Sequence, residues 1–131
     1  MKKLVIIMAV LMSYQISTAQ LIKNKTWTCK EIITLSDTIR MTDDKFSVFF
    51  YADGNAICRT DCNDFFGTYT ADKDKLSYVK ESGTKMFCPD SFESEFMDFF
   101  SGAKSFIVAD GGKTLTICLK NQGKMIFKCQ K

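Results

Sequence analysis

Apolar and polar residues alternate over several short stretches of this chain, which is typical of β-strands that bury one face. In residues 45–51, the clearest of them, apolar side chains occupy every second position, and Phe49 and Tyr51 fall on the opposite face. Similar patterns predict strands over residues 26–35, 55–60, 65–70, 76–80, 84–87, 114–119 and 125–128, with a short one near Ile39. We therefore expect a chain made mainly of short antiparallel strands joined by turns.

One later stretch has the spacing of a helix. Its apolar stripe consists of Phe92, Phe96, Phe99, Phe100 and Ala103. Asp90 and Glu93 fit a capping box at its start, and Gly102 is placed to end it. The expected fold class is α+β, a mostly antiparallel, curved or barrel-like sheet with one amphipathic helix packed on it. We expect this helix or a loop to cover Phe49 and Tyr51, which would mark a binding surface if they were exposed.

Two turns predict how neighbouring strands pair. The Asp-Gly sequence at residues 53–54 is a strong signal for a two-residue hairpin, whose type I′ turn needs positive φ at both positions. The Asn-Gln-Gly sequence at residues 121–123 suits a three-residue loop with glycine in the left-handed position. Counting from these turns places Cys58 opposite Phe49 on the outer face of the sheet, and Cys129 on the core face.

The first 19 residues have the features of a secretory signal peptide. Two lysines precede an apolar run at residues 4–12, and small residues up to Ala19 provide a cleavage site. The run is far shorter than the roughly 20 residues that span a bilayer. We therefore expect export to the periplasm or the exterior, cleavage near Ala19, and a soluble domain of residues 20–131 with no membrane span. The first cysteine is Cys29, so no lipoprotein cysteine is expected.

The charge balance and the residue types that the chain lacks exclude several classes of function. Removing the two lysines leaves 18 − 2 = 16 basic residues against 15 acidic ones, a near balance that does not support nucleic acid as a partner. The chain has no histidine, which excludes Ser-His-Asp triads and the common histidine metal sites. It also has no Cys-x-x-Cys pair and no glycine-rich phosphate loop. We expect a protein that is not an enzyme, with no catalytic residues, metal or cofactor.

Two cysteine-containing motifs carry a resemblance to a known family. They are residues 62–69 (CNDFFGTY) and residues 84–89 (TKMFCP). Together with Trp27 they resemble the META domain, the family of HslJ-like heat-shock proteins, over residues 22–129. Where that family usually has glycine before the first motif, this chain has Asp61. The resemblance implies a fold and an extracytoplasmic setting, and it implies no established reaction.

The chain has six cysteines, and in an exported protein an even number favours disulfides over metal binding. The two family motifs converge on Cys62 and Cys88, so the resemblance implies a bridge between them. The other four cysteines can pair in three ways. Matching the predicted faces favours Cys29–Cys129 and Cys58–Cys118. The alternative is that these four are reduced thiols that pack as small buried hydrophobes.

Two functions stay open for such a domain. The resemblance implies a stress-related or protective interaction protein, with an unknown envelope or extracellular protein as its partner. The alternative is a small-ligand-binding barrel that uses its interior or a groove. In either case, we expect the binding site where the Cys62 corner, Lys85 and the 53–54 turn come together, because loops on a rigid scaffold carry function. The candidate binding residues are Asn63, Asp64 and Lys85.

Overall fold

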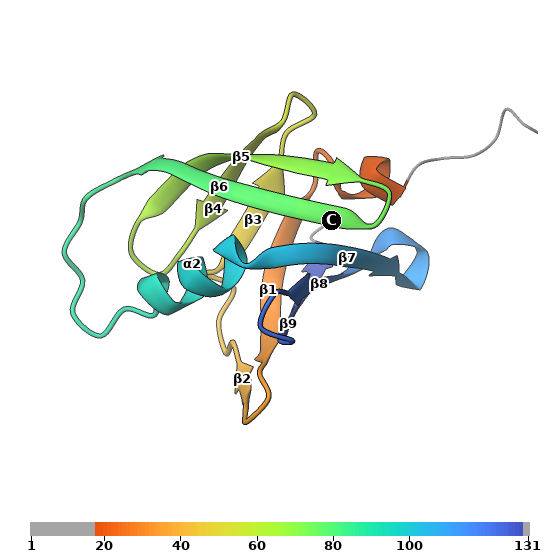
Figure 1. The fold of residues 1–131 in the computed structure, drawn as a ribbon. Coiled ribbons are helices and arrows are strands. Elements are labelled where there is room, and N and C mark those ends of the chain that lie inside the picture. The colour runs from red at the N-terminus through yellow and green to blue at the C-terminus, as the bar shows by residue number, and fades with distance from the viewer. Residues whose placement is uncertain (1–17, 130–131) are drawn as a thin grey trace, which may run out of the picture.

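The computed structural model of the protein describes residues 18–129 (Figure 1). These residues form nine strands, one α-helix and two short 3-10 helices. The strands are β1 (Thr26–Ile33), β2 (Thr38–Arg40), β3 (Ser47–Phe50), β4 (Asn55–Arg59), β5 (Asp64–Asp72), β6 (Lys75–Gly83), β7 (Ala103–Ala109), β8 (Thr114–Leu119) and β9 (Lys124–Cys129). The helices are η2 (Thr18–Ile22), α2 (Glu93–Ser101) and η3 (Asp110–Gly112). The predicted signal peptide falls almost entirely outside the described residues.

The strands make one antiparallel sheet in the order β2-β1-β3-β4-β5-β6-β7-β8-β9, and β1 also pairs with β9. The sheet therefore closes on itself as a ring (Figure 1). Its weakest junction lies between β6 and β7, where Lys75 and Ser105 are the one pair in register among the described residues. The helix α2 lies beside β6 at this junction. The predicted class, a mostly antiparallel curved sheet with one helix, is confirmed.

Side chains fill the inside of the ring. The largest of those with no exposed surface are Trp27, Phe50, Phe96, Phe100 and Phe127. The Phe100 ring of α2 lies 4.6 Å from the ring of Tyr78 and 6.3 Å from that of Phe50, between centroids. Since Phe50 points to the core face of β3, α2 packs on the inner side of the sheet. We expected the helix or a loop to cover Phe49 and Tyr51. The helix lies on the opposite face from both, and Tyr51 is 40% exposed, so this expectation is wrong for the helix and for Tyr51.

Groups outside the helix cap the start of α2. Asp61 Oδ2 accepts a hydrogen bond of 3.0 Å from the backbone amide of Phe92, and Ser91 Oγ accepts one of 3.1 Å from the amide of Glu93. The predicted capping box of Asp90 and Glu93 is therefore wrong. Asp61 reaches the helix from the turn that precedes β5.

The β3–β4 hairpin has a three-residue loop in place of the predicted two-residue turn. Tyr51 donates its backbone amide to the carbonyl of Asn55 at 2.8 Å, and Gly54 is the one loop residue with positive φ, at 95°. Val48 therefore lies opposite Cys58, and Cys58 is buried in the core. The extra loop residue shifts the register by one, which moves every side chain of β4 to the other face.

The β8–β9 hairpin also has a three-residue loop, one position earlier than predicted. Gln122 takes the left-handed conformation, with φ of 72°, and Ile117 lies opposite Met125. Gly123 has an ordinary φ and is needed for a close approach, because a Cβ there would lie 2.9 Å from the carbonyl oxygen of Ile33. This register differs from the predicted one by two residues, so the core-facing side of each strand is unchanged.

The cysteines follow the prediction at one pair and depart from it at the others. The Cys62–Cys88 disulfide is formed, with Cα atoms 6.0 Å apart. Cys29 and Cys58 are buried thiols and Cys118 is a half-buried one, so neither Cys29–Cys129 nor Cys58–Cys118 exists. In register, Cys29 lies opposite Phe127. Cys58 is inside the ring, whereas Cys118 alternates with inward residues of β8 and faces outward.

Burial should keep the two core thiols unreactive in the folded protein. It raises the pKa of Cys29 and of Cys58 from 9.0 to about 12. Alkylation at about pH 8, followed by peptide mapping, should leave both unlabelled in the native protein and label both in denaturant. Unfolded thiols ionise first as pH rises, so stability should fall between about pH 9 and about pH 12. A disulfide found at either cysteine would contradict this prediction.

Candidate functional site

The side chain of Asn63, which is 4% exposed, organises the corner between β4 and β5. Its Oδ1 accepts hydrogen bonds from the Met86 amide at 2.6 Å and from the Thr84 hydroxyl at 2.8 Å. Its Nδ2 donates to the Met86 carbonyl and to Glu93 Oε1, both at 3.0 Å. One buried amide thereby ties the corner to the segment after β6 and to the first residue of α2.

The Glu93 carboxylate completes this corner. Its Oε2 accepts hydrogen bonds from the Asn63 backbone amide at 2.9 Å and from the Thr60 hydroxyl at 3.2 Å. The sequence predicted a capping role for Glu93, and no local pattern links it to Asn63, thirty positions away. Because the amide and the carboxylate satisfy each other, this corner works as a scaffold and offers neither group to a ligand.

The other predicted binding residues are only partly brought together. Asp64 bonds Thr84 through its backbone, and its half-buried side chain makes no hydrogen bond within residues 18–129. Lys85 is exposed beside the Asn63 corner and forms no ion pair in the same range. The 53–54 turn lies at the opposite end of β4 from Cys62, so the predicted meeting of all three parts is wrong.

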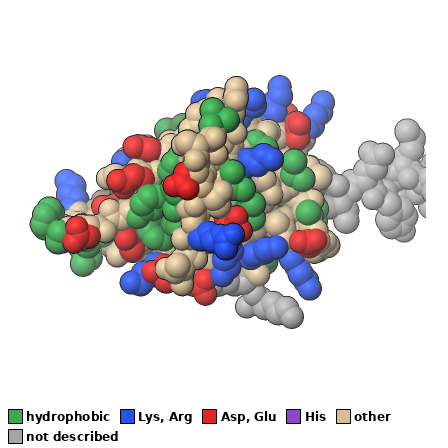
Figure 2. Space-filling model, turned by 90° about the horizontal axis from the view of Figure 1, so that it is seen from below, with side chains coloured by type: hydrophobic (Ala, Val, Ile, Leu, Met, Phe, Trp, Pro, Cys, Tyr) green, Lys and Arg blue, Asp and Glu red, His purple; other side chains and the backbone are tan. Residues whose placement is uncertain are grey.

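The segment between β6 and α2 projects from the rest of the molecule (Figure 1). Hydrophobic side chains lie at its tip, at the left of Figure 2. Its exposed apolar residues are Met86 and Phe87, at 65% and 92% of their surface. The backbone of Met86 is held by the Asn63 side chain, and Cys88 is held by the disulfide to Cys62, so the exposed Phe87 lies between two fixed residues.

The outer face of the sheet carries a second exposed apolar group. Phe49 lies opposite Ile57, and Ile57 lies opposite Phe66, so the three side chains cross β3, β4 and β5 in line. Tyr51 extends this line, with its ring 4.6 Å from that of Phe49 between centroids. Tyr51 and Phe66 are each 40% exposed. We call these four residues the aromatic row.

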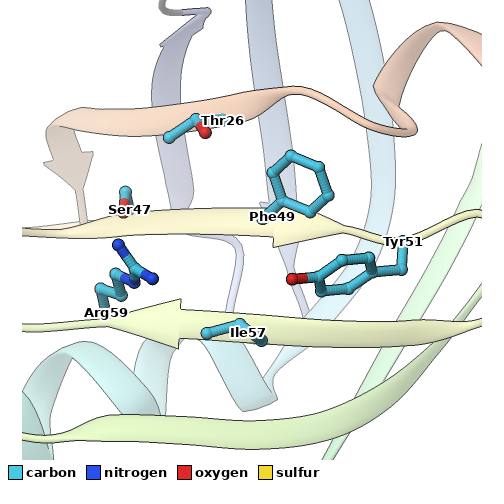
Figure 3. A pocket seen from close by; sticks show the side chains of 6 residues that line it. All are labelled: Thr26, Ser47, Phe49, Tyr51, Ile57 and Arg59. Atoms are coloured by element: carbon cyan, nitrogen blue, oxygen red, sulfur yellow. The ribbon is translucent and has the colours of Figure 1, made fainter.

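Two adjoining cavities flank the aromatic row. The first has a volume of about 110 Å³ and is lined by Thr26, Ser47, Phe49, Tyr51, Ile57 and Arg59 (Figure 3). The second, of about 270 Å³, is lined by Tyr51, Asp53, Asn55, Ala56, Ile57, Phe66 and Gly67. The sequence pattern identified Phe49 and Tyr51 as a binding surface if exposed, but it did not identify Ile57, Phe66 or Arg59. The predicted register had set Cys58 where Ile57 stands, which hid the continuity of this face.

Two further observations bear on the available chemistry. Within residues 18–129, no three histidine, cysteine or acidic side chains are grouped so that they could hold a metal ion. In the same part of the chain, no helix combines the length and the apolar character that crossing a bilayer requires.

Comparison with known proteins gives the family. In fold, the chain is similar to a protein from Burkholderia xenovorans solved by NMR, with 18% identity and a TM-score of 0.72 over 86% of each chain. It is also similar to the crystal structure of a DUF4847 family protein from Bacteroides vulgatus, with 15% identity and a TM-score of 0.66 over 86% of this chain and 96% of that one. No curated protein matches it. The model of the META domain family matches residues 19–131, and the chain belongs to that family.

Proposed function

We propose that this META-domain protein is an exported, non-catalytic binding module of the cell envelope, stress-related or protective, which holds its partner on the aromatic row. The observation that carries the proposal is the exposure of Tyr51 and Phe66, at 40% each, beside Phe49 and Ile57 on the outer face of the sheet. Connected apolar side chains left exposed on a rigid sheet are typical of an interaction surface. Large aromatic residues are also the side chains that most often dominate binding energy.

Two features of the chain support export. The N-terminal sequence has the charge and apolar pattern of a signal peptide. The Cys62–Cys88 disulfide suits an oxidising compartment such as the periplasm or the exterior. A stress-related role agrees with the HslJ-like resemblance of the two cysteine motifs.

A binding role without catalysis agrees with the available side chains. The chain has no histidine, and the Asn63 amide and Glu93 carboxylate bind each other. The second candidate function, small-ligand binding, is better supported on the outer face than inside the ring. Trp27, Phe50 and Phe127 occupy the interior with no exposed surface, whereas both described cavities of the aromatic row open outward.

Polar substitutions in the aromatic row should weaken binding and leave the fold intact. Tyr51→Ser and Phe66→Ser should each lower capture of envelope components by at least about tenfold, because a central aromatic contact is worth 2 kcal/mol or more. The measurement is affinity capture from the envelope fraction by the disulfide-containing protein, with mass spectrometry of what is bound. Complementation of a deletion strain under envelope stress provides a second readout.

The matched control is Ile107→Ser, which removes an exposed apolar side chain (59%) from β7, away from the aromatic row. All three variants should keep the melting temperature of the parent within a few degrees, since surface changes seldom exceed about 0.5 kcal/mol. Unchanged capture by both aromatic variants, or an equal loss with Ile107→Ser, would overturn the proposal.

A further inference from the structure

We propose that the smaller cavity of the aromatic row binds the carboxylate of a small amphipathic acid, whose apolar body lies along the row. This inference rests on the proposed function, since it uses the same face, and it adds the chemical class of the ligand. The aromatic row supplies the apolar wall, and Arg59 at one end supplies a positive charge.

The guanidinium of Arg59 is available to a ligand. Arg59 forms no ion pair and no side-chain hydrogen bond within residues 18–129. Asp64 lies opposite it in the register of β4 and β5, yet the two side chains do not form an ion pair. In Figure 3, Arg59 extends from β4 toward Ser47 on the neighbouring strand. Its donors are thus directed along the cavity wall.

Two hydroxyl groups line the same cavity. Those of Thr26 and Ser47 make no hydrogen bond to the rest of the described chain. Ser47, on β3, lies next to the guanidinium, and Thr26, on β1, lies farther from it in the same cavity lining (Figure 3). The Tyr51 hydroxyl also points to this cavity in Figure 3, from the side of the aromatic row. Several unused donors around one space suit an oxyanion, because each can donate to its lone pairs.

Size and charge select a carboxylate among the oxyanions. A cavity of about 110 Å³ admits a small group, and the planar guanidinium matches a carboxylate through two parallel hydrogen bonds. The face has one arginine, with Asp64 beside it and Asp53 in the adjoining cavity. That balance favours a singly charged ligand over a phosphate or a polyanion.

The adjoining cavity accommodates the apolar part of the ligand. Ile57 and Tyr51 line both cavities, so a chain that leaves the carboxylate at Arg59 crosses Ile57 toward Phe66. The second cavity, of about 270 Å³, offers the Phe66 ring and the backbone at Gly67. An acyl or aryl carboxylate can therefore place its charged group in the first cavity and its apolar part in the second.

The test is an NMR titration of the ¹⁵N-labelled protein with octanoate as the probe and octanamide as a neutral compound of equal length. Octanoate should shift the amide signals of β3 and β4 and bind at least about tenfold more tightly than octanamide, because it can form charge-assisted hydrogen bonds with Arg59. Arg59→Met should lower the octanoate affinity by a similar factor and leave the octanamide affinity unchanged. Arg40→Met, at the chain's other arginine on β2, is the matched control and should change neither.

Three results would overturn the inference: no octanoate binding, equal affinity for the two compounds, or no effect of Arg59→Met on octanoate. Failure of the inference can be told apart from failure of the proposed function. If Phe66→Ser abolishes envelope capture while Arg59→Met changes nothing, the carboxylate site is refuted and the binding module stands. If the aromatic variants bind octanoate and envelope components as well as the parent does, both are refuted.

Discussion

Replacing Asn63 by alanine is expected to lower the free energy of unfolding by about 3 kcal/mol. The change leaves the Met86 amide and the Thr84 hydroxyl without their acceptor, and it removes a donor from the Glu93 carboxylate. Buried polar groups that lose their partners cost about 1–3 kcal/mol each, and a charged group costs more. Partial entry of water at the half-buried Glu93 limits the total.

Denaturant unfolding of the disulfide-containing protein measures this loss. Lys85→Ala and Asp64→Ala are the controls, because neither side chain makes a hydrogen bond or an ion pair within residues 18–129. Both should stay within about 0.5 kcal/mol of the parent. An Asn63→Ala protein as stable as these two would show that the corner does not depend on the buried amide.

Removing the Cys62–Cys88 disulfide should cost about 3.5 kcal/mol. The two cysteines are 26 positions apart, so the bridge closes a loop of 26 + 1 = 27 residues and restricts the unfolded chain accordingly. The Cys62→Ser/Cys88→Ser double variant should show this loss in denaturant unfolding. The projecting segment, which is then held by hydrogen bonds without the covalent bridge, should also become more sensitive to proteolysis.

Two comparisons isolate the effect of the bridge. Reduction of the parent should lower its stability to that of the double variant, and reduction of the double variant should change nothing further. Cys118→Ser, which alters a half-buried thiol outside any disulfide, should have a small effect. A parent whose stability is insensitive to reduction would contradict the prediction.

The predicted binding residues and the residues of the exposed aromatic face have different structural roles. Asn63 was predicted to bind because it belongs to a family motif. The structure shows that the hydrogen bonds of its side chain stabilise the fold. Arg59 lies outside the two motifs and Phe66 lies within the first, and neither was predicted to bind, yet both line the cavities on the outer face of the sheet. A motif can therefore mark a residue that shapes a surface without lining it.

Local rules predicted much of this fold. Strict alternation over residues 45–51 identified the strand and its core face, and Phe46, Val48 and Phe50 are all buried. Helical spacing identified α2, of which Phe96 and Phe100 are completely buried. Such patterns repeat with the period of a single element, so neighbouring residues determine them.

These local rules could not predict the register in which neighbouring strands pair. An Asp-Gly pair is compatible with a two-residue or a three-residue loop, and the pairing of β3 with β4 selected the longer one. That single residue turned Cys58 inward and Ile57 outward. The aromatic row exists because of this shift, since Ile57 connects Phe49 to Phe66.

By itself, the sequence determined most of the strands, the helix, the family and, through its motifs, the Cys62–Cys88 bridge. The strand predicted over residues 84–87 is absent, because the Met86 backbone bonds the Asn63 side chain instead of a neighbouring strand, and β7 was not predicted. Only the tertiary structure decided which residues face each other, that α2 packs on the core face of the sheet, and that Asp61 caps the helix instead of Asp90. The reason is physical: an element's period follows from local backbone geometry, whereas register and burial follow from closing the whole sheet. The contacts that decide them, such as Asn63 with Glu93, join residues that are far apart in the chain.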